Sequence, residues 1–213
     1  NGTVIGWNAC YRDFTPDVIC ATDAGIMSDI IDSGYDGKCY FTHNSWNLLP
    51  DASYDALKTG KERETYRRFD AKYFVYISGL DSNVENSQSY IFWVSPSMED
   101  NIKNIGKEVY GWSTGTSALH IACRDYTWDD YEKVYLLGFD HDNDYYDNIY
   151  ADTDHYFNQH REMRGVHKEW TKQIINTIHN HPCIQFIWVN YRGDNFPKLP
   201  NLFSKDETEI WRV

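Results

Sequence analysis

The stretch GWSTGTSALHIACRDYTWDDYEKVYLLGFDHDND, residues Gly111–Asp144, decides the fold of this chain. A turn of small residues opens a helical pattern, and the apolar segment Val134–Gly138 then follows as a buried-strand pattern. This strand pattern runs directly into the polar cluster Asp140–Asp144. In an open α/β sheet, ligands bind just outside the carboxyl ends of the strands, so these polar side chains are candidates for a binding site.

The turn before the helical pattern is rich in hydroxyl groups. Its members are Ser113, Thr114, Gly115, Thr116 and Ser117. The first backbone N–H groups of a helix have no partner within the helix and can receive an anion. Together with the polar strand end, the turn favours a pocket for a charged, phosphate-bearing ligand.

Apolar runs that end in polar residues recur along the chain. We expect strands at Thr3–Ala9, Asp17–Asp23, Lys38–His43, Lys72–Ser78, Tyr90–Ser95, Lys133–Phe139 and Ile184–Asn190. Near-continuous apolar strands are typical of a sheet that is covered on both faces. The fold class predicted is therefore α/β, with a mostly parallel, Rossmann-like central sheet and helices on both faces.

Helical patterns lie between these runs, at Ala24–Ser33, Thr116–Tyr126 and His160–His179. In the last of these, one buried stripe is expected, made of Met163, Val166, Trp170, Ile174, Ile175 and Ile178. The segment GDNFPKLP, Gly193–Pro200, interrupts regular structure. We expect the C-terminal tail that follows it to wrap around the surface.

The composition limits the class of protein. The 213 residues, 41% hydrophobic and 16% aromatic, predict one globular domain spanning 1–213. The net charge of −12 argues against nucleic acid as a partner, because such binding depends on lysine and arginine. No apolar run approaches the ~20 residues of a membrane-spanning helix, so no transmembrane segment is expected. Association into a homo-oligomer stays open.

Five cysteines are scattered along the chain, an odd number without a CxxC pair: Cys10, Cys20, Cys39, Cys123 and Cys183. Such a pattern is typical of reduced thiols in or near the core and not of disulfides or a zinc site. We therefore expect a cytoplasmic protein and no bound metal in the leading interpretation.

The expected strands deliver polar residues to one edge of the sheet. Asn8, Asp23 and Asp140 each follow an apolar run, and His43 with Asn44 follows another. For any one of them, a helix cap or a turn is the simpler interpretation. For the whole set, a shared pocket is favoured.

The run Asp140–Asp144 has the alternating acidic and amide groups of a calcium loop. A calcium loop needs glycine at its sixth place and glutamate at its twelfth, where this chain has Tyr145 and Ala151. That interpretation fails. A magnesium site remains open, because one or two carboxylates and substrate phosphates suffice for Mg²⁺.

Two histidines, His155 and His160, precede the last helical pattern. Their spacing of five residues is poor for two ligands on one helical face. A single histidine can act as a general base if a substrate hydroxyl lies beside it. No nucleophile elbow, zincin, P-loop or dinucleotide motif is present in the sequence.

These motifs resemble a known group. WSTGTSALHIACRDYTWDDYEKVYLLGFDHDN is similar to the bacterial sialyltransferase segment in which a small-residue turn opens a helix and a strand ends in Gly-(Ile/Phe)-Asp. It equally resembles MptE-like proteins, which include an archaeal pterin diphosphokinase. VIGWNA is similar to the group's strand that ends in a nucleotide-contacting asparagine, here Asn8, and PDVICATDAG carries Asp23 as in the MptE-type version. His155–His160 resembles the stretch that holds the sialyltransferase base.

The resemblance implies a nucleotide-sugar-dependent glycosyltransferase of sialyltransferase-like fold, with a CMP-sugar as the favoured donor and a carbohydrate acceptor. Asn8, Ser113, Thr114 and Gly115 would hold the nucleotide. Asp140 and Asp142 would bind its base or ribose, or a metal. Tyr145 or Tyr146 would support the leaving phosphate, and His160, or else His155, would be the base. The group's phosphate loop precedes VIGWNA, so we expect this domain to lack its first strand and that loop.

Two other functions stay open. The first is an MptE-like diphosphokinase or phosphotransferase, which would use Asp23 and Asp140 with Mg²⁺. The second is a non-catalytic binding or structural protein on the same fold.

Overall fold

The computed structural model describes residues 2–41, 47–48, 72–78, 88–94, 101–109, 111–126, 133–139, 149–150, 153–154, 164–191 and 195–210. The chain divides into two compact units, Asn1–Thr114 and Gly115–Val213. The single domain expected from the length stays a prediction. None of the described helices is long and apolar enough to cross a membrane.

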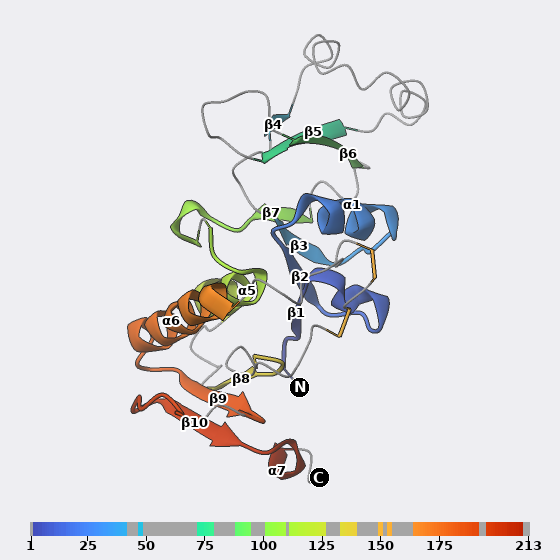
Figure 1. Cartoon of the computed structure of the whole chain (residues 1–213). Helices are drawn as coiled ribbons and strands as arrows, with labels where there is room; N and C mark the ends of the chain where they lie inside the picture. The colour runs from blue at the N-terminus through green and yellow to red at the C-terminus, as the bar shows by residue number, and fades with distance from the viewer. Residues whose placement is uncertain are drawn as a thin grey trace. The chain divides into compact units, whose positions relative to one another are not determined.

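The first unit contains a parallel sheet of four strands, drawn in blue to green in Figure 1. The strands are β1 (Ile5–Trp7), β2 (Val18–Ala21), β3 (Lys38–Phe41) and β7 (Ile102–Asn104), in the order β1-β2-β3-β7. Each neighbouring pair is parallel. All four residues of β2 are buried, as expected for an apolar inner strand of a parallel sheet. The mixed α/β class with parallel strands is confirmed for these residues.

Helix α1 (Ala24–Asp32) connects β2 to β3 and buries one stripe. Ile26, Met27 and Ile30 form this stripe, because residues three and four apart share a helical face. The 3₁₀ helix η1 (Asn8–Arg12) contacts α1 through an ion pair of 3.0 Å between Arg12 and Asp29. A second 3₁₀ helix, η5 (Lys107–Val109), follows β7.

A separate antiparallel sheet also belongs to the first unit. It consists of β4 (Asn47–Leu48), β5 (Lys72–Ser78) and β6 (Gln88–Val94). Two of these strands were expected from the sequence, but within a mostly parallel sheet. Local periodicity predicts that a segment is a strand, but it does not identify the strand with which that segment pairs. The short connection 79–87 suits antiparallel neighbours.

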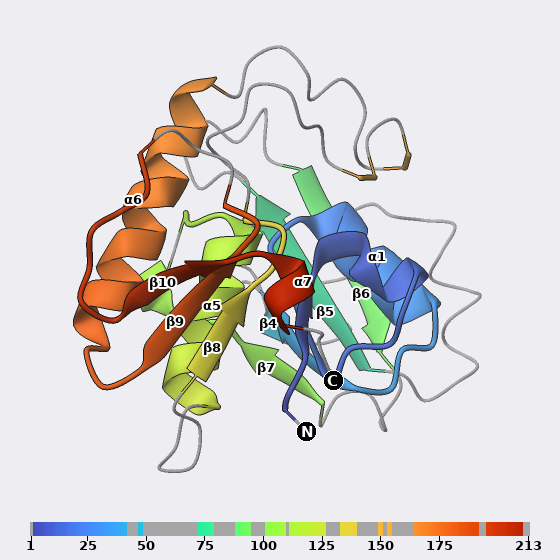
Figure 2. The same cartoon turned by 90° about the horizontal axis from the view of Figure 1, so that it is seen from below.

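The second unit contains α5, which begins at Thr114 and ends at Asp125, and a parallel sheet in the order β10-β9-β8. Its strands are β8 (Lys133–Leu136), β9 (Gln185–Val189) and β10 (Leu202–Lys205). Helix α6 (Arg164–Asn180) precedes β9 and runs alongside β9 and β10 in Figure 2. The tail expected to wrap the surface instead supplies β10 and the short helix α7 (Glu207–Ile210).

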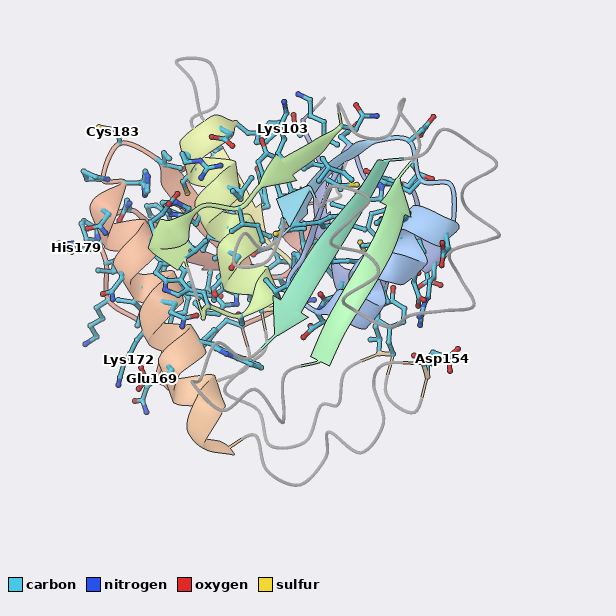
Figure 3. The ribbon with its side chains drawn as sticks, turned by 90° about the horizontal axis from the view of Figure 1, so that it is seen from above. Lys103, Asp154, Glu169, Lys172, His179 and Cys183 are labelled. Atoms are coloured by element: carbon cyan, nitrogen blue, oxygen red, sulfur yellow. The ribbon has the colours of Figure 1, made fainter. Side chains whose placement is uncertain are left out.

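The core of the second unit is built from α6 and the sheet. Ile174 and Ile178 of the expected helical stripe are fully buried, whereas Trp170 and Ile175 are half-buried. Strand β9 contributes Phe186 and Trp188 to the core. The polar side of α6 carries the ion pair of Glu169 and Lys172, both labelled in Figure 3.

One asparagine closes the end of α6. The Asn201 amide donates to the carbonyl oxygens of Ile178, His181 and Ile184, at 3.2, 3.0 and 3.0 Å. Ile178 lies in the last turn of α6, where carbonyl groups lack a partner within the helix, and the amide adds to the bond that Ile178 already accepts from the N–H of His181. The amide also fixes the turn that leads from α6 into β9.

Candidate functional site

Polar residues gather at the carboxyl edge of the sheet in the first unit. Because β1, β2, β3 and β7 are parallel, their carboxyl ends lie on one edge. Asn8 follows β1, Thr22 and Asp23 follow β2, and Gly106 lies just beyond β7. Neighbouring strands lie about 5 Å apart, which brings the residues that follow β1 and β2 close together. His43 and Asn44, expected after β3, lie outside the described residues.

Asn8 has an unusual backbone and an unusual side chain. Its φ of 53° is left-handed, a conformation in which asparagine is among the few tolerated side chains. Its Oδ1 is buried and has no hydrogen-bond partner among the residues that the structure describes. Buried polar atoms nearly always have a partner, so this oxygen marks a position that a ligand or an ordered water can satisfy.

Two threonine hydroxyls of the first unit form a hydrogen bond with each other. The Oγ1 atoms of Thr22 and Thr114 are 2.5 Å apart. Thr22 follows β2, and Thr114 is both the last residue of the first unit and the first residue of α5. The contact joins the residue that follows β2 to Thr114 within the first unit.

Helix α5 begins at Thr114, two residues before the start at Thr116 that the sequence pattern predicted. Thr114 and Gly115 are the first residues of α5, and both are buried, whereas Ser113 before them is half-buried. In the second unit, Thr116 donates to the side chain of Gln173 at 2.7 Å. A helix start made of small residues leaves its first N–H groups unobstructed by long side chains. These groups are the chemical basis for an anion site at this turn.

Asp23 occupies the position before α1, where an aspartate often caps the helix. Its backbone carbonyl accepts from the N–H of Met27 at 2.9 Å, but its carboxylate makes no capping hydrogen bond. The side chain is exposed at the carboxyl end of β2. The simple capping interpretation therefore covers the backbone of Asp23 and not its carboxylate.

A second carboxylate near this edge was not found from the sequence. Gly106 has a φ of 113°, and a Cβ there would overlap the carboxylate of Glu108. Glycine adopts this left-handed backbone without the strain that another residue would incur. The signal in the sequence is a glycine two residues after β7, a strand that the apolar patterns did not predict.

The thiols of the first unit are not candidates for catalysis. Burial raises the pKa of the Cys10 thiol to about 11 and that of Cys39 to about 12. In the second unit, burial raises the pKa of Cys123 to about 12. Thiols with such pKa values are protonated at neutral pH and are poor nucleophiles and ligands. Cys183, in contrast, is exposed, which corrects its expected place in or near the core (Figure 3).

The remaining predicted site residues lie outside the described residues: Asp140, Asp142, Tyr145, Tyr146, His155 and His160. Their shared pocket with Asn8 and Asp23 stays a prediction. Within the described ranges, no group of three or more His, Cys, Asp or Glu side chains is placed to hold a metal ion.

No family model, no curated protein and no solved structure matches this chain.

Proposed function

We propose that this protein is a nucleotide-sugar-dependent glycosyltransferase that binds its nucleotide at the carboxyl edge of the β1-β2-β3-β7 sheet. The observation that carries the proposal is the hydrogen bond between Thr22 and Thr114, which joins the residue after β2 to the hydroxyl-rich turn within the first unit. Hydroxyl groups at the end of a parallel strand suit a phosphate-bearing ligand. Asn8, directly after the neighbouring strand β1, adds a carboxamide to the same edge.

The reaction needs few groups from the protein. His160, or else His155, takes the proton of the acceptor hydroxyl as its oxygen bonds to the anomeric carbon of the donor. The bond between that carbon and the phosphate oxygen breaks, and the nucleotide leaves with the electron pair. Ser113, Thr114 and the N–H of Gly115 stabilise the charge of the departing phosphate, with Tyr145 or Tyr146 as a further donor. Asp140 and Asp142 hold the base or ribose in this scheme, and a CMP-sugar is the favoured donor.

A thermal-shift panel tests the nucleotide part of this proposal. CMP, CDP, UDP, GDP and ATP are added with and without Mg²⁺, since a ligand that binds only the folded state raises its apparent stability. We expect a shift with CMP in the wild type and a much smaller shift in Thr114→Val. Thr177→Val is the matched control, because Thr177 is an equally buried threonine that bonds to the Gln173 carbonyl within α6. A panel without any shift contradicts the proposal and leaves a non-catalytic protein.

Asp23 favours a second candidate, an Mg²⁺-dependent phosphotransferase. Its exposed carboxylate at the end of β2 is of the type that holds Mg²⁺ together with substrate phosphates. The two candidates differ in metal dependence. Nucleotide-sugar hydrolysis that resists EDTA and survives Asp23→Asn supports the glycosyltransferase, and activity lost in both tests supports the phosphotransferase.

A further inference from the structure

Four aromatic rings form a continuous series in the second unit. The ring centroids of Phe139 and Trp188 are 6.4 Å apart, those of Trp188 and Tyr191 5.0 Å, and those of Tyr191 and Phe196 5.1 Å. Each pair is close to perpendicular, with interplanar angles of 82°, 78° and 78°. Edge-to-face contacts of this kind are favourable and directional, so each ring fixes the orientation of the next.

The inner end of the series is anchored in the core. Phe139 and Trp188 are buried, and the indole Nε1–H donates to the Phe139 carbonyl oxygen at 2.9 Å. The outer end, which we call the aromatic pair, consists of Tyr191 and Phe196. Both residues are only half-buried. The Tyr191 hydroxyl donates to the Asn195 carbonyl at 2.9 Å, which ties Tyr191 to the residue before Phe196.

The aromatic pair lies where ligands bind in parallel sheets. Tyr191 comes two residues after the carboxyl end of β9, the middle strand of the β10-β9-β8 sheet. The intervening Asn190 has a φ of 56°, and its N–H donates to the Lys205 carbonyl at 2.9 Å. The chain therefore leaves the strand in a fixed direction. The pair is an oriented apolar surface at the ligand-binding edge of this unit.

We propose that Tyr191 and Phe196 bind the ring of a carbohydrate. This inference rests on the proposed glycosyltransferase function, for which the pair supplies a contact with the acceptor. The faces of aromatic rings are negatively polarised and attract the positively polarised C–H groups of a sugar. A pyranose carries such groups on its face and around its edge, so it contacts two perpendicular rings at once. A flat nucleobase stacks on only one of them, and the net charge of −12 disfavours a polyanion.

Saturation-transfer NMR on the full chain tests this inference. The probes are the methyl glycosides of galactose, glucose and N-acetylglucosamine, with cytidine and adenosine as competing classes. We expect saturation of the C–H protons on one sugar face and contacts from these protons to the rings of Tyr191 and Phe196. Phe196→Leu keeps an apolar side chain without a ring and should weaken sugar binding about tenfold.

The matched control is Phe203→Leu. Phe203 is partly exposed, in β10 of the same sheet, and lies within its strand and not after its carboxyl end. Equal weakening by Phe196→Leu and Phe203→Leu overturns the inference, as does a wild type without sugar contacts at these rings. Contacts from the nucleosides in place of the sugars overturn it too and identify a base site. If CMP still stabilises Phe196→Leu, the nucleotide site is intact and only the sugar-binding inference has failed.

Discussion

Asn8 and Asn190 use the same backbone conformation in two units of the chain. Each directly follows a parallel strand, β1 or β9, and each is left-handed, with φ of 53° and 56°. Asn190 Oδ1 accepts from the N–H of Glu207 at 3.0 Å, at the start of α7. Asn8 Oδ1 is buried and has no partner within the described part of the chain. One asparagine therefore connects elements of its unit, whereas the other presents an unused acceptor at the edge where we place the nucleotide.

The largest effect is expected at a third asparagine, which extends the comparison. Asn201→Asp replaces the amide that donates to three carbonyl oxygens with a carboxylate that faces them. Loss of these three hydrogen bonds, together with repulsion between the carboxylate and the carbonyl oxygens, should lower the free energy of unfolding by about 3 kcal/mol. Denaturant unfolding measures this loss, and Asn195→Asp at an exposed position is the control. A loss below ~1 kcal/mol would show that the three contacts contribute little.

Asn190 should show an intermediate effect. Asn190→Ala removes the hydrogen bond to Glu207 and places alanine, which tolerates the left-handed region poorly, at φ 56°. We expect the free energy of unfolding to fall by about 2 kcal/mol. Asn190→Gly relieves the backbone strain and should lose only about 1 kcal/mol. The difference between the two variants separates the backbone contribution from that of the side chain. Equal losses in both would assign the whole effect to the side chain.

Asn8→Gly should change stability least among the asparagine variants, by less than about 0.5 kcal/mol. Glycine keeps the left-handed backbone, and the deleted Oδ1 makes no hydrogen bond with the described residues. The CMP-induced thermal shift should nevertheless fall in this variant. If Asn8→Gly destabilises the protein as much as Asn190→Gly and leaves the CMP shift intact, both asparagines are structural and the contrast between them fails.

The last comparison is between the exposed thiol and the less exposed thiols, and it should change the free energy of unfolding least. At pH 8, iodoacetamide should modify the exposed Cys183 in the folded protein. Cys39 should react only on unfolding, because burial shields it and raises its pKa to about 12. The half-buried Cys10, whose pKa is raised to about 11, should react more slowly than Cys183. Mass spectrometry of digests identifies the labelled thiols. Cys183→Ser should change the free energy of unfolding by less than about 0.5 kcal/mol.

Local patterns predicted the elements better than their partners. The bounds Lys72–Ser78 of β5 were predicted correctly, and Ile174 and Ile178 of the expected α6 stripe are buried, whereas Trp170 and Ile175 are half-buried. Strand β10 was missed because LFSK follows two prolines and its apolar and polar residues alternate only weakly. Its pairing with β9 stabilises a strand that local propensity alone does not predict. The division of strands between parallel and antiparallel sheets depends on contacts that no single run contains.

The candidate site shows the same limit. Asn8 and Thr114 could be named from the sequence because each stands beside an apolar or hydroxyl-rich segment. The contact of Thr114 with Thr22 could not, because 92 residues separate them along the chain. Glu108 was missed for a similar reason: its carboxylate matters through its approach to Gly106, which depends on a left-handed backbone.

The three-carbonyl contact of Asn201 sets an order on the synthesis of the second unit. The side chain that closes α6 lies 17 to 23 residues beyond the carbonyls it binds, after the whole of β9. During translation, α6 is therefore complete in sequence while its last turn still lacks these hydrogen bonds. The end of the helix becomes stable only when the chain has emerged past β9 and its following loop has closed. A ribosome stalled before residue 201 would hold a unit whose helix α6 frays at one end.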